Sequence, residues 1–139
     1  MTFGELKALV MNQTTNDAVD LADFEPYLST YLNEGYDKLF YAFTSQRLAA
    51  GGAAPPLTAA NDSPKLPAWS HRTLADYATW MLYRNGNQQR QQRGYVYQGA
   101  FEAVMNEALA LRGRLVDTDG DGIPDAEDNT PRSFTNLYP

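Results

Sequence analysis

The sequence predicts an all-α protein: a small four-helix bundle with one long helix, a long loop between its second and third helices, and an extended acidic C-terminal arm. Apolar residues recur at helical spacing in four separate segments. We find no strand with the clear alternation that a half-buried β-strand requires. The length of 139 residues and the hydrophobic content of 43% suit one compact domain with an appended segment. We therefore divide the chain into a helical body, residues 1–114, and a C-terminal arm, residues 115–139.

The first helix is predicted over residues 2–12. Thr2 and Glu5 have the spacing of a capping box, and the apolar residues of the segment fall on one side: Phe3, Leu6, Leu9 and Val10. The second helix is predicted over about residues 26–47, because Pro26 suits a first-turn position. Its apolar stripe is wide and contains Leu28, Leu32, Tyr36, Leu39, Phe40 and Phe43, with Tyr27, Tyr31 and Tyr41 beside or opposite it.

A long surface loop is predicted over residues 49–65, where Ala, Gly, Pro, Asn and Ser dominate. The third helix follows from about Pro67 and ends at Asn85, since Gly86 can take the left-handed conformation. Its predicted inner side holds Trp69, Leu74, Tyr77, Ala78 and Met81.

The fourth helix is the longest and is predicted over residues 88–112, before Gly113. Its apolar stripe is predicted to contain Tyr97, Ala100, Phe101, Val104, Ala108 and Leu111. The first two turns, residues 88–93, hold no apolar residue. We therefore expect them to project into solvent or toward a neighbouring molecule.

Charge is distributed unevenly along the chain. The formal net charge is -6, and the arm holds six acidic residues with Arg132 as its only base, so the body is close to neutral. A near-neutral body argues against tight wrapping of nucleic acid, although transient passage of DNA stays open. The chain has no cysteine, which excludes disulfides, thiolate metal sites and a cysteine nucleophile. It shows no export signal and no apolar stretch long enough to span a bilayer, so we expect a soluble chain with no membrane partner.

The arm contains a pattern typical of calcium binding. Counted from Asp117, carboxylates occupy positions one, three, five, nine and twelve, Gly122 stands at the sharp turn, and position seven offers a carbonyl. The predicted ligands are therefore Asp117, Asp119, Asp121, Ile123, Asp125 and Asp128. The segment resembles the calcium loops of EF-hands and, with residues 129–131 after it, a thrombospondin type 3 repeat.

Two residues depart from the EF-hand pattern. Asp128 is shorter than the usual bidentate Glu, and Pro124 lacks the N–H with which paired loops form a small ladder. We therefore expect a single, unpaired loop that binds calcium. The alternative is an acidic, solvated tail that binds nothing specifically.

Residues 66–71, 75–87 and 91–94 resemble the head-to-tail connector (adaptor) proteins of tailed bacteriophages, and residues 32–39 resemble the second helix of that family. The resemblance spans about residues 21–109. It implies a virion structural protein, made in the host cytoplasm and located in the neck at the head–tail junction. In such a protein the subunits form a homo-oligomeric ring, commonly of about twelve copies. The ring lies between the portal protein and a tail or stopper protein, and DNA passes through its channel without sequence-specific binding.

Two groups of residues are interface candidates under this resemblance. In such proteins the segment after the long helix often docks on the portal, and Phe134, Leu137 and Tyr138 offer apolar anchors that have no core explanation. Arg84, Arg90 and Arg93 cluster around the turn between the third and fourth helices. They line a channel, pair with acids of the next subunit, or form a solvated face, and the sequence leaves these alternatives open.

We expect no catalysis. His71 is the only histidine, and no nucleophile–base set or phosphate-binding glycine motif accompanies it, so a structural role is predicted. Core packing alone accounts for the apolar stripes. An alternative function is a calcium-dependent adhesion or surface-binding module in which the calcium loop is the working part. A helical binding module with an unrelated partner is a third option.

Overall fold

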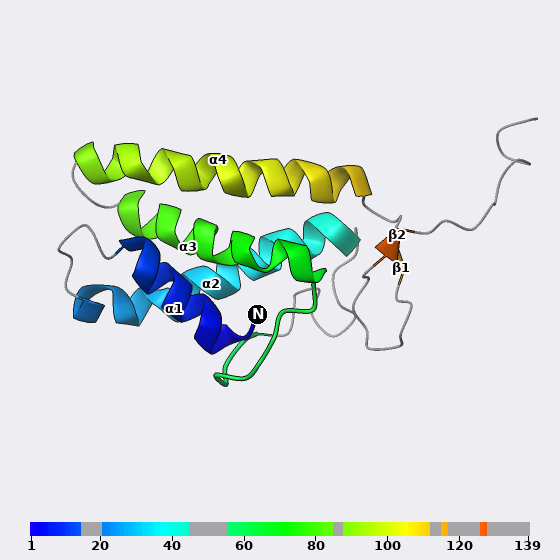
Figure 1. The fold of residues 1–139 in the computed structure, drawn as a ribbon, viewed down its shortest axis with the longest axis horizontal. Coiled ribbons are helices and arrows are strands. Elements are labelled where there is room, and N and C mark those ends of the chain that lie inside the picture. The colour runs from blue at the N-terminus through cyan, green and yellow to red at the C-terminus, as the bar shows by residue number, and fades with distance from the viewer. Residues whose placement is uncertain (15–20, 45–55, 85–87, 112–114, 117–125, 128–139) are drawn as a thin grey trace, which may run out of the picture.

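Four α-helices form the body of the protein. The computed structural model describes residues 1–14, 21–44, 56–84, 88–111, 115–116 and 126–127. The helices are α1 Phe3–Thr14, α2 Leu21–Thr44, α3 Arg72–Arg84 and α4 Gln88–Leu111, with a short 3-10 turn, η2 Ala68–Ser70, before α3. The predicted all-α bundle is therefore confirmed (Figure 1). None of the described helices combines the length and the apolar character that crossing a bilayer requires.

The central element is α3, which contacts each of the other three helices. In Figure 1, α4 runs along one side of α3, whereas α1 and α2 lie on the other side. Nine of the 13 residues of α3 are buried. A helix that is buried nearly all round is positioned by all its neighbours at once, so it forms a firm base for side chains that reach the surface.

The apolar stripes of α1 and α2 pack as predicted. Phe3, Leu6 and Val10 of α1 are buried, as are all six stripe residues of α2. The capping box also forms: the Thr2 N–H donates to Glu5 Oε1 at 3.0 Å, and the Glu5 N–H donates to Thr2 Oγ1 at 3.2 Å. These contacts fix where α1 begins.

The predicted start of the second helix at Pro26 is wrong, because α2 begins at Leu21 and Pro26 stands in its second turn. A proline there removes one backbone hydrogen bond, and the helix nevertheless continues through it. The helix is described as far as Thr44, and its predicted end at Arg47 lies outside the described residues.

The chain enters α3 through a tighter turn than predicted. The third helix was expected from Pro67, whereas the structure has η2 first and an α-helix only from Arg72. The prediction that Trp69 lies on the inner side is wrong: its side chain is 49% exposed and meets the Phe43 ring edge-on at 5.7 Å. A 3-10 turn advances three residues per turn, so α-helical spacing does not carry Trp69 into the core.

The inner stripe of α4 is largely confirmed. Phe101 and Ala108 are buried, and Tyr97, Val104 and Leu111 are partly buried. Ala100 was predicted in this stripe but is exposed. It stands on the edge of the stripe that turns away from α3, about 100° around the helix from its neighbour Phe101.

The described part of the loop before α3 packs against the bundle. The Leu57 N–H donates to Asn33 Oδ1 at 2.7 Å, and Asn33 Nδ2 donates to the Leu57 carbonyl at 3.1 Å. The Phe3 and Gly4 N–H groups donate to carbonyls of this loop, at Asp62 and Ala60. The loop therefore satisfies backbone donors at the start of α1 that a helix leaves without internal partners.

Two very short strands follow α4. β1 Leu115–Val116 and β2 Ala126–Glu127 pair antiparallel, with Leu115 opposite Glu127 and Val116 opposite Ala126. Strands of two residues are too short to show alternation in a sequence, which is why none was predicted there. Residues 117–125, between the two strands, lie outside the described residues.

Candidate functional site

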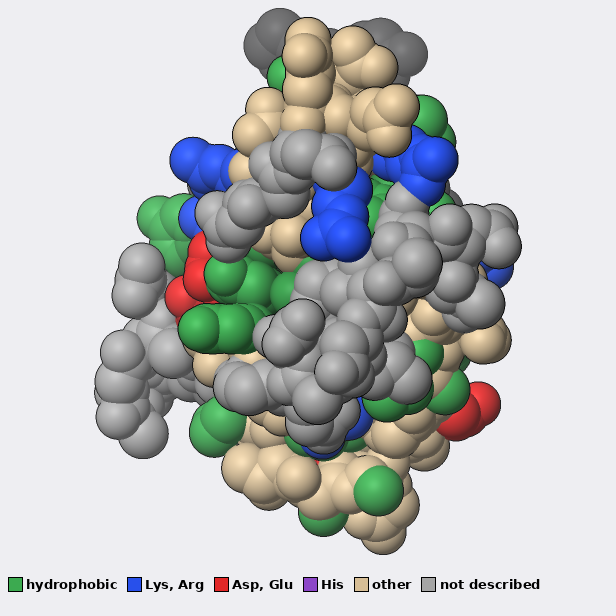
Figure 2. Space-filling view, turned by 90° about the vertical axis from the view of Figure 1, so that its left-hand side faces the viewer, with side chains coloured by type: hydrophobic (Ala, Val, Ile, Leu, Met, Phe, Trp, Pro, Cys, Tyr) green, Lys and Arg blue, Asp and Glu red, His purple; other side chains and the backbone are tan. Residues whose placement is uncertain are grey.

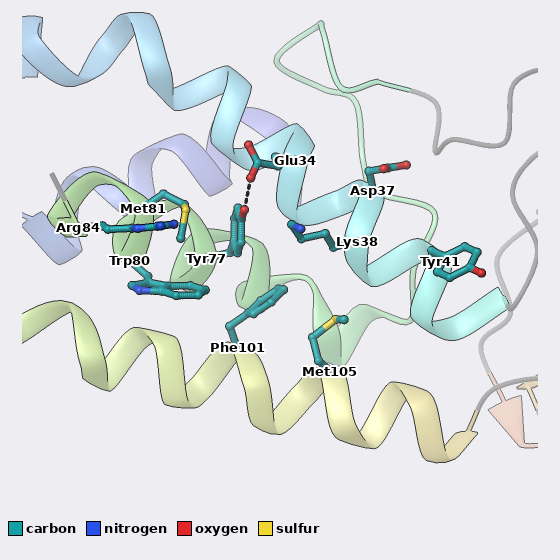
Figure 3. A pocket seen from close by; sticks show the side chains of 10 residues that line it. All are labelled: Glu34, Asp37, Lys38, Tyr41, Tyr77, Trp80, Met81, Arg84, Phe101 and Met105. Atoms are coloured by element: carbon teal, nitrogen blue, oxygen red, sulfur yellow. Dashed lines mark hydrogen bonds between the residues drawn. The ribbon is translucent and has the colours of Figure 1, made fainter. Parts of the chain in front are cut away.

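An open groove of about 560 Å³ lies where α2, α3 and α4 meet (Figure 3). We call it the α2–α4 groove. Its base comes from α3 and α4, and consists of Tyr77, Trp80, Met81, Phe101 and Met105. Its rim comes from α2 and the end of α3, and consists of Glu34, Asp37, Lys38, Tyr41 and Arg84.

Three aromatic rings form the base of the groove. The Tyr77 and Phe101 rings lie 4.8 Å apart between centroids, and the Tyr77 and Trp80 rings meet edge-to-face at 5.8 Å. Tyr77 and Phe101 are buried, whereas Trp80 is half-buried and reaches the groove. Packed aromatic rings of this kind give a rigid apolar surface at little entropic cost on binding.

A glycine on α2 brings the rim close to this base. A Cβ at Gly35 would lie 2.9 Å from Cδ1 of Tyr77, which is closer than real Cβ atoms approach. The α2 backbone therefore rests directly on the Tyr77 ring, and only glycine leaves room for this contact. The shape of the groove therefore depends on glycine at position 35, because any larger residue would push α2 away from the Tyr77 ring.

One hydrogen bond joins the rim to the base. The Tyr77 hydroxyl donates to Glu34 Oε1 (Figure 3). Burial raises the pKa of the Tyr77 hydroxyl well above its ordinary value, and the Glu34 carboxylate acts in the same direction. Tyr77 therefore stays protonated at neutral pH, and it serves as a hydrogen-bond donor that fixes the position of α2 over α3.

The rim carries charges of both signs. Glu34, Asp37 and Lys38 come from α2, and Arg84 stands at the end of α3. The groove therefore has no strong net field of one sign. It suits an apolar element with polar groups at its edges better than a highly charged polymer.

A second hollow of about 370 Å³ adjoins the groove along α4. It shares Trp80 and Arg84 with the groove, and Gln91, Tyr95 and Gln98 complete its lining. The Tyr95 side chain is 62% exposed. The accessible aromatic surface thus continues from the groove toward the start of α4.

The structure separates the three predicted interface arginines. Arg84 is exposed and lines both of these hollows, whereas Arg90 is half-buried, Arg93 is exposed, and neither Arg90 nor Arg93 lines either of the two. Figure 2 views the end of the molecule where α3 ends and α4 begins, and several Lys and Arg side chains are exposed on this face. Of the three arginines, only Arg84 belongs to the groove.

The predicted arm residues lie outside the described part of the chain. These are the calcium ligands Asp117, Asp119, Asp121, Ile123, Asp125 and Asp128, and the anchors Phe134, Leu137 and Tyr138. Within the described ranges, no group of three or more His, Asp or Glu side chains could hold a metal ion. The β1–β2 pairing bears on the calcium loop, because it sets Val116 opposite Ala126, the residues on either side of residues 117–125.

His71 is held by two structural contacts. Nδ1 lies 2.8 Å from the Met1 ammonium, which can only donate, so Nδ1 accepts and the proton sits on Nε2. The Nε2–H then donates to the Leu66 carbonyl at 2.8 Å. Burial lowers the pKa of His71, and the charge of the nearby ammonium also lowers it. Both ring nitrogens are thus engaged in holding the chain start against the segment before α3.

Comparison with known proteins gives no match: no family model fits the chain, and neither a curated protein nor a solved structure is similar to it at a significant level. Interpretation of the groove therefore depends on its geometry and chemistry.

Sequence reasoning missed the groove as a unit. It assigned Tyr77, Met81 and Phe101 to ordinary core packing, and it did not single out Trp80 or Met105. Tyr77 and Phe101 are indeed buried, yet they also line the groove. The available signal was Gly35, a helix-weakening residue beside the apolar stripe of α2, because such a glycine often marks a close approach.

Proposed function

We propose that this chain is a non-catalytic virion structural protein, a head-to-tail adaptor that assembles into a ring between a portal and a tail or stopper protein. DNA passes through the channel of that ring. The observation that carries the proposal is the open, aromatic α2–α4 groove on a bundle whose own core is complete. The resemblance of residues 21–109 to adaptor proteins gives the groove its proposed context.

The core satisfies its own polar groups. Among the described residues, no buried side-chain nitrogen or oxygen lacks a hydrogen-bond partner. The bundle nevertheless leaves several large hydrophobic side chains more than 40% exposed: Tyr27, Tyr41, Trp69, Tyr95, Val96 and Leu109. Aromatic side chains are enriched in protein interfaces, so this surface favours contact with other protein chains.

The proposed occupant of the α2–α4 groove is the neighbouring subunit of the ring. A cyclic ring requires a heterologous contact, in which two different surfaces of each subunit meet. The groove supplies a concave surface with an apolar base and a rim of mixed charge. Rim charges of both signs fix the register of such a contact more than they strengthen it.

The proposal includes a calcium-ordered arm. Residues 117–128 have ligands in calcium order, and the β1–β2 pairing supports a closed loop because it already joins the ends of the segment. Bound calcium would offset the mutual repulsion of the aspartates. The ordered arm would then present Phe134, Leu137 and Tyr138 to the portal.

Two observations support the absence of catalysis. Both nitrogens of His71 are engaged in structural hydrogen bonds. Tyr77, the one titratable group buried at the base of the groove, has a raised pKa, so its hydroxyl stays protonated at neutral pH and cannot accept a proton as a general base.

The test is the assembly state of the full chain, measured by analytical ultracentrifugation and negative-stain imaging, with and without calcium. We expect ring-shaped oligomers, or a complex with a portal protein from the same virion. Tyr41→Ser, at the end of the groove, should weaken assembly, whereas Tyr27→Ser, on the same helix but outside the groove, should leave it unchanged. A monomer under all conditions, with portal present, would overturn the proposal.

A further inference from the structure

The outward side of α4 carries a row of residues with the spacing of a coiled-coil seam. Steps of four and three residues alternate along this row, which we call the α4 seam: Gln89, Arg93, Val96, Ala100, Ala103, Glu107 and Ala110. All seven side chains are exposed. An alternation of four and three is the repeat by which two helices pack side by side along their length.

The middle of the α4 seam is small enough for close helix packing. Ala100 and Ala103 present only methyl groups, and a Cβ built at the adjacent Gly99 meets nothing within 4 Å. Val96, the bulkiest apolar residue of the seam, is 73% exposed. This surface is apolar at its centre and would lose little side-chain entropy on burial.

The charges of the α4 seam are arranged symmetrically about Ala100. Arg93 lies seven residues before Ala100 and Glu107 lies seven residues after it. If a second α4 runs antiparallel across this point, each Arg93 faces the Glu107 of the other copy. A parallel arrangement would instead set Arg93 against Arg93 and Glu107 against Glu107, which is unfavourable.

We propose that the α4 seam pairs antiparallel, around Ala100, with the α4 seam of a second copy of this chain. The apolar centre and the two Arg93–Glu107 pairs make the surface self-complementary, which is the mark of a two-fold contact. A single helix pair with small side chains buries little area, so the dimer is weak and depends on concentration.

This pairing goes beyond the proposed ring and does not depend on it. A two-fold contact closes on itself and cannot form a ring by repetition. The α4 seam and the α2–α4 groove also share no residue. The seam dimer is therefore a separate association of two subunits.

Charge reversal tests the pairing in the full chain by sedimentation equilibrium. Arg93→Glu or Glu107→Arg alone should raise the dimer dissociation constant about tenfold, because two attractive pairs become repulsive. Mixing the two single variants should restore association as a heterodimer, and so should the double variant. Both positions are exposed, so unchanged thermal unfolding provides the folding control. Equal dimerisation by all variants, or a monomer throughout, would overturn the proposal.

Disulfide trapping tests the antiparallel register, and the chain offers a clean background because it has no cysteine. A mixture of Val96→Cys and Ala103→Cys should form a mixed disulfide, whereas neither variant alone should crosslink. In the proposed register, like positions lie about 10 Å apart along the axis, beyond the reach of a disulfide. Ala100→Cys alone should crosslink to itself. Crosslinking of Val96→Cys to itself, or no mixed disulfide, would contradict the proposal.

The two proposals fail in different ways. Tyr41→Ser, at the groove, should leave the seam dimer intact, and Glu107→Arg should leave ring particles intact. If the chain forms the seam crosslink but no rings, only the adaptor proposal is contradicted. If it forms rings but no seam crosslink, only the α4 seam proposal is contradicted.

Discussion

Gly35→Ala tests whether α2 really rests on the Tyr77 ring. The added Cβ would lie 2.9 Å from Cδ1, 3.0 Å from Cγ and 3.2 Å from Cβ of Tyr77, so one of the two groups must shift. The Tyr77 ring is poorly placed to move, because it packs at 4.8 Å from Phe101 and its hydroxyl donates to Glu34. Any movement therefore disturbs the whole base of the groove.

The magnitude follows from two opposing effects. Forcing an extra methyl group into a packed site costs roughly 1–3 kcal/mol. Replacing a helical glycine by alanine contributes about 1 kcal/mol in the other direction, through helix propensity. The net loss of unfolding free energy is therefore about 0–2 kcal/mol, or a fall in Tm of up to roughly 8 °C for a chain of this size.

Gly99→Ala is the matched control. Gly99 also lies in the middle of a long helix, but its added Cβ would meet nothing within 4 Å. Propensity alone then applies, and the variant should be more stable by about 0.5–1 kcal/mol. Both variants can be measured by chemical and thermal unfolding followed by circular dichroism. If Gly35→Ala proves as stabilising as Gly99→Ala, the close approach of α2 to Tyr77 is refuted.

Because burial lowers the pKa of His71 in the folded chain, the free energy of unfolding should fall as pH drops below the ordinary value of 6.5. Urea unfolding between about pH 7.5 and 5 should show this slope, and His71→Gln should remove that part of it. Asn33→Ala should cost about 1–3 kcal/mol in thermal unfolding, since it breaks both hydrogen bonds to Leu57, while Asn12→Ala at an exposed site of α1 should cost little. Isothermal titration should show calcium binding that an Asp119→Ala, Asp121→Ala variant loses, and equal heats from the two chains would contradict the calcium loop.

Periodicity predicted the buried sides of α1 and α2 well, because each of these helices has one face in the core. Leu32 and Leu39, for example, are both fully buried at the spacing that predicted them. The start of α2 was wrong because proline marks a preferred first-turn position but does not forbid a second-turn one. Trp69 was misplaced because η2 changes the number of residues per turn just before α3.

The groove and the packed loop were beyond the reach of local patterns. Asn33 forms hydrogen bonds with the backbone of Leu57, 24 residues away. No sequence pattern in either segment predicts this contact. The groove needs three helices at once, and its position depends on the side of α2 that faces Tyr77. Sequence patterns report which side of a helix is apolar, whereas they do not report which other helix covers it.

The misassignment of Ala100 has a physical cause that connects the fold to the surface of α4. The buried residues of this helix are Gly94, Phe101 and Ala108, and α4 packs closely against α3 at Gly94, where an added Cβ would lie 3.1 Å from the Tyr83 Cβ. Its exposed side is also apolar, at Tyr95 and Val96 among others. Because α4 has apolar residues on both its buried side and its exposed side, a stripe predicted from sequence alone includes positions from both sides. Ala100 was assigned to the buried stripe in this way, although it belongs to the exposed side. A helix that needed only its own core would show one stripe and a polar opposite face. The exposed apolar stripe of α4 is therefore not explained by packing within the monomer. Its exposure and its helical spacing favour contact with another protein surface.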